Sequence, residues 1–135
     1  MKYNFFSDSE FFSKLSTAEI KDVEQSNTLR NNKDELKAIL NIIRRATNEP
    51  IMINSWYRNE EHNERAKGRP NSQHLDGEAV DITSKNNDKL YSTILQLMKK
   101  DLTLGQVIKY GSNPIRFIHI SLCTRGKINH ILNCE

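Results

Sequence analysis

The chain has 135 residues, of which 36% are hydrophobic and 27% are charged, and its 20 basic residues exceed its 17 acidic ones for a formal net charge of +3. This length predicts one domain over residues 1–135, and the composition excludes a disordered, fibrous or membrane-spanning class. The basic residues are interleaved with acidic ones, so we expect no nucleic-acid partner and no membrane partner.

The beginning of the chain contains no apolar run of the length that a signal peptide requires. We therefore expect synthesis in the cytoplasm. Nothing in the sequence indicates a repeat or a linker, and we expect a monomer.

The first third of the chain is predicted to be helical. Residues 7–30 indicate two short helical pieces. Asn32 is a suitable N-cap, and Glu35 follows three residues later as in a capping box, so a longer helix is expected from there to about Ala46. Its apolar stripe has the spacing of one helix face and consists of Leu36, Ile39, Leu40 and Ile43.

The middle of the chain alternates short strands with polar segments. A buried strand is predicted over 51–56 and a second strand over 79–82. Between them, we expect an exposed helical turn over 59–66 and a loop over 68–73.

The last third predicts a helix over 87–100 and strands over 106–109, 117–122 and 128–132. The turn at 111–114 joins the first two strands as a hairpin. Two long helices and a small, mainly antiparallel sheet packed with helices define an α+β fold. Cys123 and Cys134 lie in the last strand region outside any C-x-x-C pair, and we interpret both as buried free thiols.

The segment at 72–81, Ser-Gln-His-Leu-Asp-Gly-Glu-Ala-Val-Asp, is the most informative in the sequence. His74 and Asp81 are seven residues apart and share no face of a regular helix or strand. They can converge across a tight turn, which Gly77 permits because glycine adopts positive φ at little steric cost. Imidazole and carboxylate are both suitable zinc ligands.

A third candidate ligand, His119, lies between Ile118 and Ile120 on a predicted strand. Alternation turns a histidine between two core isoleucines away from their core and toward a cleft. A lone histidine or aspartate in such a place usually has only a structural role, but the combined pattern is far more specific. Three protein ligands with an open fourth position are typical of a catalytic zinc site, so we expect one Zn²⁺ per chain.

Other polar residues carry weaker signals. His62 lies among glutamates on a charged turn, and we interpret it as part of a solvated face; we place His130 on the surface. Arg58 follows the strand that leads to the metal motif, and its guanidinium can hold a carboxylate or polarise a carbonyl.

These motifs resemble, in order and spacing, those of the M15 family of zinc peptidases, the group of D-Ala-D-Ala carboxypeptidases and phage endolysins, over about residues 8–125. The matching segments are Ser55-Trp56-Tyr57-Arg58, Asn63, the run 72–81 and Phe117-Ile118-His119. The resemblance implies a hedgehog/DD-peptidase-like fold. It also implies His74, Asp81 and His119 as zinc ligands, Arg58 as the catalytic group on the substrate carbonyl or carboxylate, and Ser72 and Gln73 as the lining of the metal loop.

The sequence departs from this family in one respect. Many members carry a glutamate three residues before the last histidine as the general base, and this chain has Arg116 there. The substitutes that we consider are Glu64, Asp76, Glu78 and Tyr110.

The leading hypothesis is a zinc-dependent peptidase that hydrolyses an amide bond in a peptidoglycan stem peptide, as a D-Ala-D-Ala carboxypeptidase or an L-Ala-D-Glu endopeptidase. Action on the cell wall then depends on release by a holin or another export system. The alternative is a catalytically impaired zinc-containing module that binds peptidoglycan or has a structural role. A metal-dependent nuclease has little support, because the chain has no clustered basic stripe and no phosphate-cradling loop.

Overall fold

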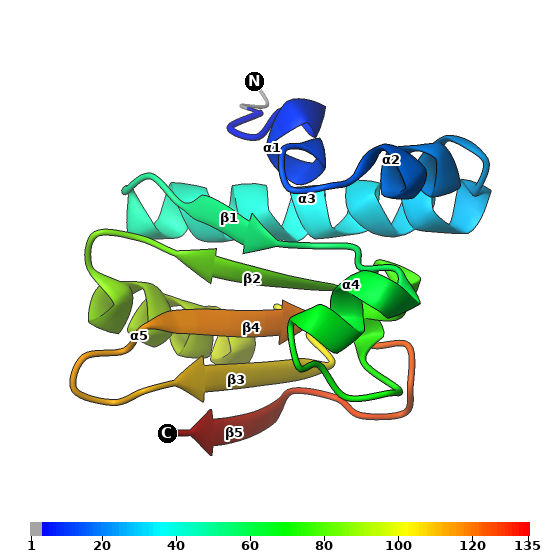
Figure 1. Cartoon of the computed structure of the whole chain (residues 1–135). Helices are drawn as coiled ribbons and strands as arrows, with labels where there is room; N and C mark the ends of the chain where they lie inside the picture. Colours follow the sequence, from blue (N-terminus) through cyan, green and yellow to red (C-terminus); the bar gives the residue numbers. More distant parts are fainter. Residues whose placement is uncertain (1–3) are drawn as a thin grey trace.

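The computed structural model describes residues 4–135, and its centre is a five-stranded sheet (Figure 1). In spatial order the strands are β1 (Met52–Ser55), β2 (Ala79–Thr83), β4 (Phe117–Ser121), β3 (Gln106–Tyr110) and β5 (His130–Cys134). The first four pair as antiparallel neighbours, and β5 pairs with β3 in parallel. The predicted α+β fold with a mainly antiparallel sheet is therefore confirmed, as is the hairpin of β3 and β4.

The helices are α1 (Asp8–Phe12), α2 (Thr17–Glu24), α3 (Asn27–Thr47), α4 (Glu60–Arg65) and α5 (Asn87–Lys100), with a 3₁₀ turn η1 (Gln73–Asp76). Figure 1 shows α3 and α5 behind the sheet, while α4 and the loop after it lie in front of the adjoining ends of β2 and β4. The two long helices thus leave the front face of the sheet for other contacts. No helix within residues 4–135 is long and apolar enough to cross a membrane.

The hydrophobic core lies between the long helices and the rear face of the sheet. Alternation along β4 turns Ile118 and Ile120 into this core, where both are fully buried, and leaves His119 on the front face. From the helices, the core receives the apolar stripes of α3 and α5, which include Leu36, Leu40, Ile43, Leu90 and Ile94.

The long helix begins earlier than the sequence predicted. Its N-cap is Ser26, whose hydroxyl accepts a hydrogen bond from Leu29 N at 3.1 Å, so the predicted cap at Asn32 and capping box at Glu35 are wrong. Burial of Leu29 extends the apolar stripe by two turns and favours the earlier start. Asn32 instead donates from Nδ2 to the carbonyl oxygen of Asp76, which joins α3 to η1.

The predicted burial of the two cysteines is also wrong, because Cys123 and Cys134 are exposed free thiols. Cys123 lies in the loop after β4, and Cys134 lies on β5, one of the two edge strands of the sheet. This last strand occupies 130–134 rather than the predicted 128–132.

Candidate metal centre

A tight turn brings His74 and Asp81 together, as the spacing predicted. Ser72 caps η1 by accepting a hydrogen bond from His74 N at 3.1 Å, and Gly77 ends the turn at φ 67°. The indole N–H of Trp56 donates to the carbonyl of Gly77 at 2.8 Å. A Cβ on Gly77 would lie 2.8 Å from a methyl carbon of Leu29, so both φ and space require glycine here.

The third residue, His119, reaches the same place through strand pairing. In the β2–β4 ladder, His119 lies directly opposite Asp81. Because paired residues of neighbouring strands turn to the same face, both side chains project from the front of the sheet.

The donor atoms of these three residues converge. Oδ1 of Asp81 lies 3.2 Å from Nε2 of His74 and 2.9 Å from Nδ1 of His119, and the three ligand atoms lie within 4.8 Å of one another. All three residues are buried, with exposed fractions of 3%, 7% and 8% for His74, Asp81 and His119. No other group of three such residues in the described chain is so arranged.

Hydrogen bonding sets the tautomer of His74 in a way that suits a metal ion. Its Nδ1 lies 2.5 Å from the carbonyl oxygen of Trp56, an atom that only accepts, so Nδ1 carries the proton. In the neutral ring, the lone pair of Nε2 then faces the Asp81 oxygen. Two electron-rich atoms repel one another unless a cation lies between them, so this donor set fits zinc.

Asp81 is held in its charged form. Without a metal ion, protons on the facing nitrogens of His119 and His74 take its place. Burial acts to raise the pKa of Asp81, but the hydrogen bonds and charge of these two protonated rings outweigh it and hold the pKa well below its usual range. The carboxylate form is the one that binds a metal ion.

Arg58 lies beside this cluster, with most of its side chain covered. Its backbone N donates to the carbonyl of His74 at 3.0 Å, which ties it to the metal loop. Its side chain donates from Nε to Ser55 Oγ at 3.2 Å, from Nη1 to Asn63 Oδ1 at 3.4 Å and from Nη2 to Asp81 Oδ2 at 3.4 Å. The guanidinium is therefore fixed at the edge of the cluster.

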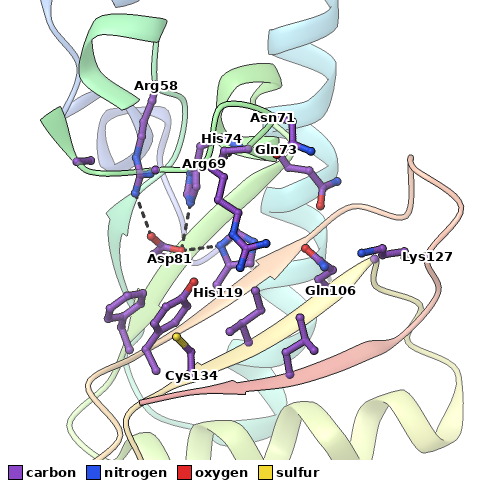
Figure 2. Close-up of a pocket in the computed structure, with 18 of the residues that line it drawn as sticks. Arg58, Arg69, Asn71, Gln73, His74, Asp81, Gln106, His119, Lys127 and Cys134 are labelled. Atoms are coloured by element: carbon purple, nitrogen blue, oxygen red, sulfur yellow. Dashed lines mark hydrogen bonds and ion pairs between the residues drawn. The ribbon is translucent and has the colours of Figure 1, made fainter. Parts of the chain in front are cut away.

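The cluster opens into a cleft of about 670 Å³ on the front face of the sheet (Figure 2). Ser72 and Gln73 also line this cleft. The amide of Gln73 donates to the carbonyl of Leu122 at 3.2 Å and to Thr124 Oγ1 at 3.3 Å, so it holds the loop after β4 against η1. The structure thus brings His74, Asp81, His119, Arg58, Ser72 and Gln73 to one cleft.

Of the four substitutes considered for the missing base, Tyr110 alone lines the cleft. Asp76 and Glu78 instead form ion pairs with Arg125, and these pairs hold both carboxylates away from the metal cluster. The residue of β3 opposite His119 is Ile108, which offers no proton-transferring group. Burial, and then the charge of Asp81, raises the pKa of Tyr110 above 10.0, so its phenol is a hydrogen-bond donor at neutral pH.

Sequence reasoning misjudged or missed several residues around the site. His62 is not part of a solvated face, because its Nδ1 lies 2.8 Å from Oε2 of the buried Glu19. The sequence could not show that the Trp56 carbonyl accepts a hydrogen bond from His74, because every residue has a backbone carbonyl. Arg69 and the C-terminal strand also line the cleft, and no motif marked them.

A buried His-Asp-His cluster in a cleft beside an arginine can hold a catalytic metal ion, with three protein ligands and an open fourth position. The family model described as Peptidase M15 matches residues 9–121, and the chain belongs to that family. No curated protein matches the chain closely enough to add a relative.

Proposed function

We propose that the protein is a zinc-dependent peptidase that hydrolyses an amide bond in peptidoglycan stem peptides. The observation that carries the proposal is the convergence of His74 Nε2, Asp81 Oδ1 and His119 Nδ1 at the floor of an open cleft, in a chain of the M15 family. A site with three protein ligands that faces a cleft leaves a fourth position for water or substrate.

His74, Asp81 and His119 would hold the metal. When bound, zinc supplies Lewis acidity toward a carbonyl oxygen and lowers the pKa of its water to about 7. The hydrogen bond from His74 Nδ1 to Trp56 fixes the orientation of one ligand, and strand pairing fixes the other two.

Arg58 binds and orients the substrate carbonyl or carboxylate next to the scissile bond. Its Nη1 and Nη2 each carry two hydrogens and each donates one hydrogen bond to the protein, at 3.4 Å, so a second N–H on each nitrogen remains for an incoming acceptor. Ser72 and Gln73 shape the wall of the metal loop against which the peptide lies.

Tyr110 donates a hydrogen bond or a proton on the other side of the site. A protonated phenol can stabilise a developing oxyanion or deliver a proton to the departing amine, and such help is worth about 10²- to 10⁴-fold in rate. Its ring stacks on Phe117 with centroids 4.4 Å apart, which fixes its direction over the sheet.

The proposed substrate bond is either D-Ala-D-Ala or L-Ala-D-Glu, and the enzyme acts as a monomer. Membership of the M15 family supports a peptide as the substrate.

A second function is favoured by one specific observation. Within the described residues, Asp81 is the only carboxylate that lines the cleft, so a separate general base is missing. A zinc-containing module that binds stem peptides without cleaving them is therefore the alternative.

Product analysis separates the two functions. Purified muropeptides are incubated with zinc-loaded wild type and with the His119→Ala variant, and the products are identified by mass spectrometry. A peptidase yields a new peptide fragment with the wild type alone. Binding of the muropeptide without any fragment supports the binding module instead.

A further inference from the structure

The charges that line the cleft are unevenly balanced. Five basic side chains and one carboxylate line it, namely Arg58, Lys67, Arg69, Arg125, Lys127 and Asp81. Two of the five cations are neutralised within the protein, because Arg58 pairs with Asp81 and Arg125 pairs with Asp76 and Glu78.

The other three cations have no acidic partner. In residues 4–135, the side chains of Lys67, Arg69 and Lys127 form no ion pair and no hydrogen bond with the protein. A cleft with this excess of positive charge attracts anionic ligands, and a zinc ion would add to the excess.

Arg69 is the best placed of the three, because its backbone is fixed. Its carbonyl accepts hydrogen bonds from Asn63 Nδ2 at 2.8 Å and from Ser72 N at 3.0 Å. Gly68 lies against the same asparagine, where an added Cβ would stand 2.0 Å from Asn63 Oδ1. The same Asn63 accepts from Arg58, so one buried residue positions both arginines.

Arg69 also extends into the cleft that holds the metal cluster. Figure 2 shows its side chain extending from the loop after α4 into the cleft, whereas Lys127 lies at the end of the cleft beside Gln106. Tyr110 lines the same cleft. A guanidinium that is anchored at its backbone and free at its tip matches a carboxylate bidentately.

We propose that Arg69 is a specificity residue that binds a carboxylate of the substrate peptide beside the metal centre. It is distinct from Arg58, whose guanidinium is already paired with Asp81. Lys67 and Lys127 add long-range attraction for the same anionic peptide. The inference rests on the proposed function, since it names a recognition element for that substrate.

The carboxylate can be the C-terminal one or the α-carboxylate of an internal γ-linked D-glutamate. The probes are therefore L-Ala-γ-D-Glu-L-Lys-D-Ala-D-Ala, the same peptide with a C-terminal amide, and the same peptide with the D-glutamate α-carboxylate as an amide. Binding to the metal-free protein is measured by calorimetry, so that hydrolysis contributes nothing to the heat.

We expect Arg69→Gln to weaken binding of the parent peptide about 10- to 100-fold, the loss typical of a charge-assisted hydrogen-bonded pair. For one of the two amide probes, the Kd for the wild type should equal the Kd of the parent peptide for Arg69→Gln. The affinity of that probe should be the same for the variant as for the wild type. That probe identifies the carboxylate. Arg65→Gln is the matched control, because Arg65 pairs with Glu61 on α4 and does not line the cleft.

The inference is overturned if Arg69→Gln binds all three peptides as the wild type does, or if it weakens the parent and both amides equally. Its failure is separable from that of the proposed function. If Arg69 binds a carboxylate of the peptide but no muropeptide is cleaved, the proposed peptidase activity is contradicted and the role of Arg69 is supported. If muropeptides are cleaved but Arg69→Gln binds the peptides as the wild type does, the peptidase activity is supported and the role of Arg69 is contradicted.

Discussion

Arg58 is held by three different acceptors, Ser55, Asn63 and Asp81, and each takes a different nitrogen of the guanidinium. A lysine ammonium is a point charge that cannot satisfy this planar set. We expect Arg58→Lys to lower kcat/KM for muropeptide cleavage about 10- to 100-fold while the far-UV circular dichroism stays unchanged. Arg65→Lys serves as control, and equal kinetics in the two variants would remove Arg58 from the mechanism.

Tyr110 carries the second residue-scale prediction. Removing its hydroxyl in Tyr110→Phe keeps the stack on Phe117 but deletes the donor. We expect kcat to fall about 100-fold with little change in KM, because the donor acts on charge that develops in the transition state. Steady-state kinetics on a single muropeptide test this. An unchanged kcat would mean that proton transfer proceeds through water and does not need the Tyr110 hydroxyl.

At the scale of elements, Glu19 joins α2 to the segment that carries Arg58. Its carboxylate is buried and accepts hydrogen bonds from Ser16 N and Asn59 N at 2.9 Å each, and it contacts His62 Nδ1 at 2.8 Å. Burial opposes the charge of Glu19, but these bonds prevail and lower its pKa below the ordinary 4.5.

This lowered pKa gives a pH-dependent prediction. Because folding favours the ionised form, the contribution of Glu19 to stability is present above pH 4.5 and is lost as the pH falls below it. We expect Glu19→Gln to lower the free energy of unfolding by about 1–3 kcal/mol at pH 7, with the difference narrowing below pH 4.5. Urea denaturation across pH measures it, and Glu35→Gln on the exposed face of α3 is the control that should cost nothing.

Sequence reasoning predicted most of the elements because their apolar residues are strongly periodic. The bounds of α5 and the alternation around His119 follow directly from that pattern. The start of α3 does not, because Ser26 and Asn32 are both good N-caps and the choice depends on whether Leu29 is buried by other elements. Burial of Leu29 against the turn at Gly77 is a tertiary effect that no local pattern records.

The candidate site was predictable to a similar degree. The convergence of His74 and Asp81 follows from Gly77 and the spacing, which are local. The exclusion of Asp76 and Glu78 from the cleft depends on Arg125, which approaches from the loop after β4. Contacts between segments about 50 residues apart are set by the whole sheet and leave no mark in either segment.

For the whole molecule, the metal should contribute to stability as well as to chemistry. The three ligand residues come from η1, β2 and β4, so a bound ion links three elements of the front face. A ligand at 100 times its Kd stabilises the folded state by about 2.7 kcal/mol. We expect zinc to raise the Tm by about 10 °C in a domain of this size, as measured by differential scanning fluorimetry. A Tm that is the same with zinc and with chelator would indicate that no such link forms.

The central claim is that His74, Asp81 and His119 form one zinc site, and zinc stoichiometry tests it most directly. Zinc is added to four proteins, namely the wild type, His74→Ala, His119→Ala and His130→Ala, and the excess metal is then removed. The bound zinc is measured by inductively coupled plasma mass spectrometry, and circular dichroism checks the fold. His130 lies on β5, outside the cluster, and is the matched control. The account predicts one zinc per chain in the wild type and in His130→Ala, and almost none in the other two variants. One equivalent retained in both His74→Ala and His119→Ala, with the fold intact, would contradict it.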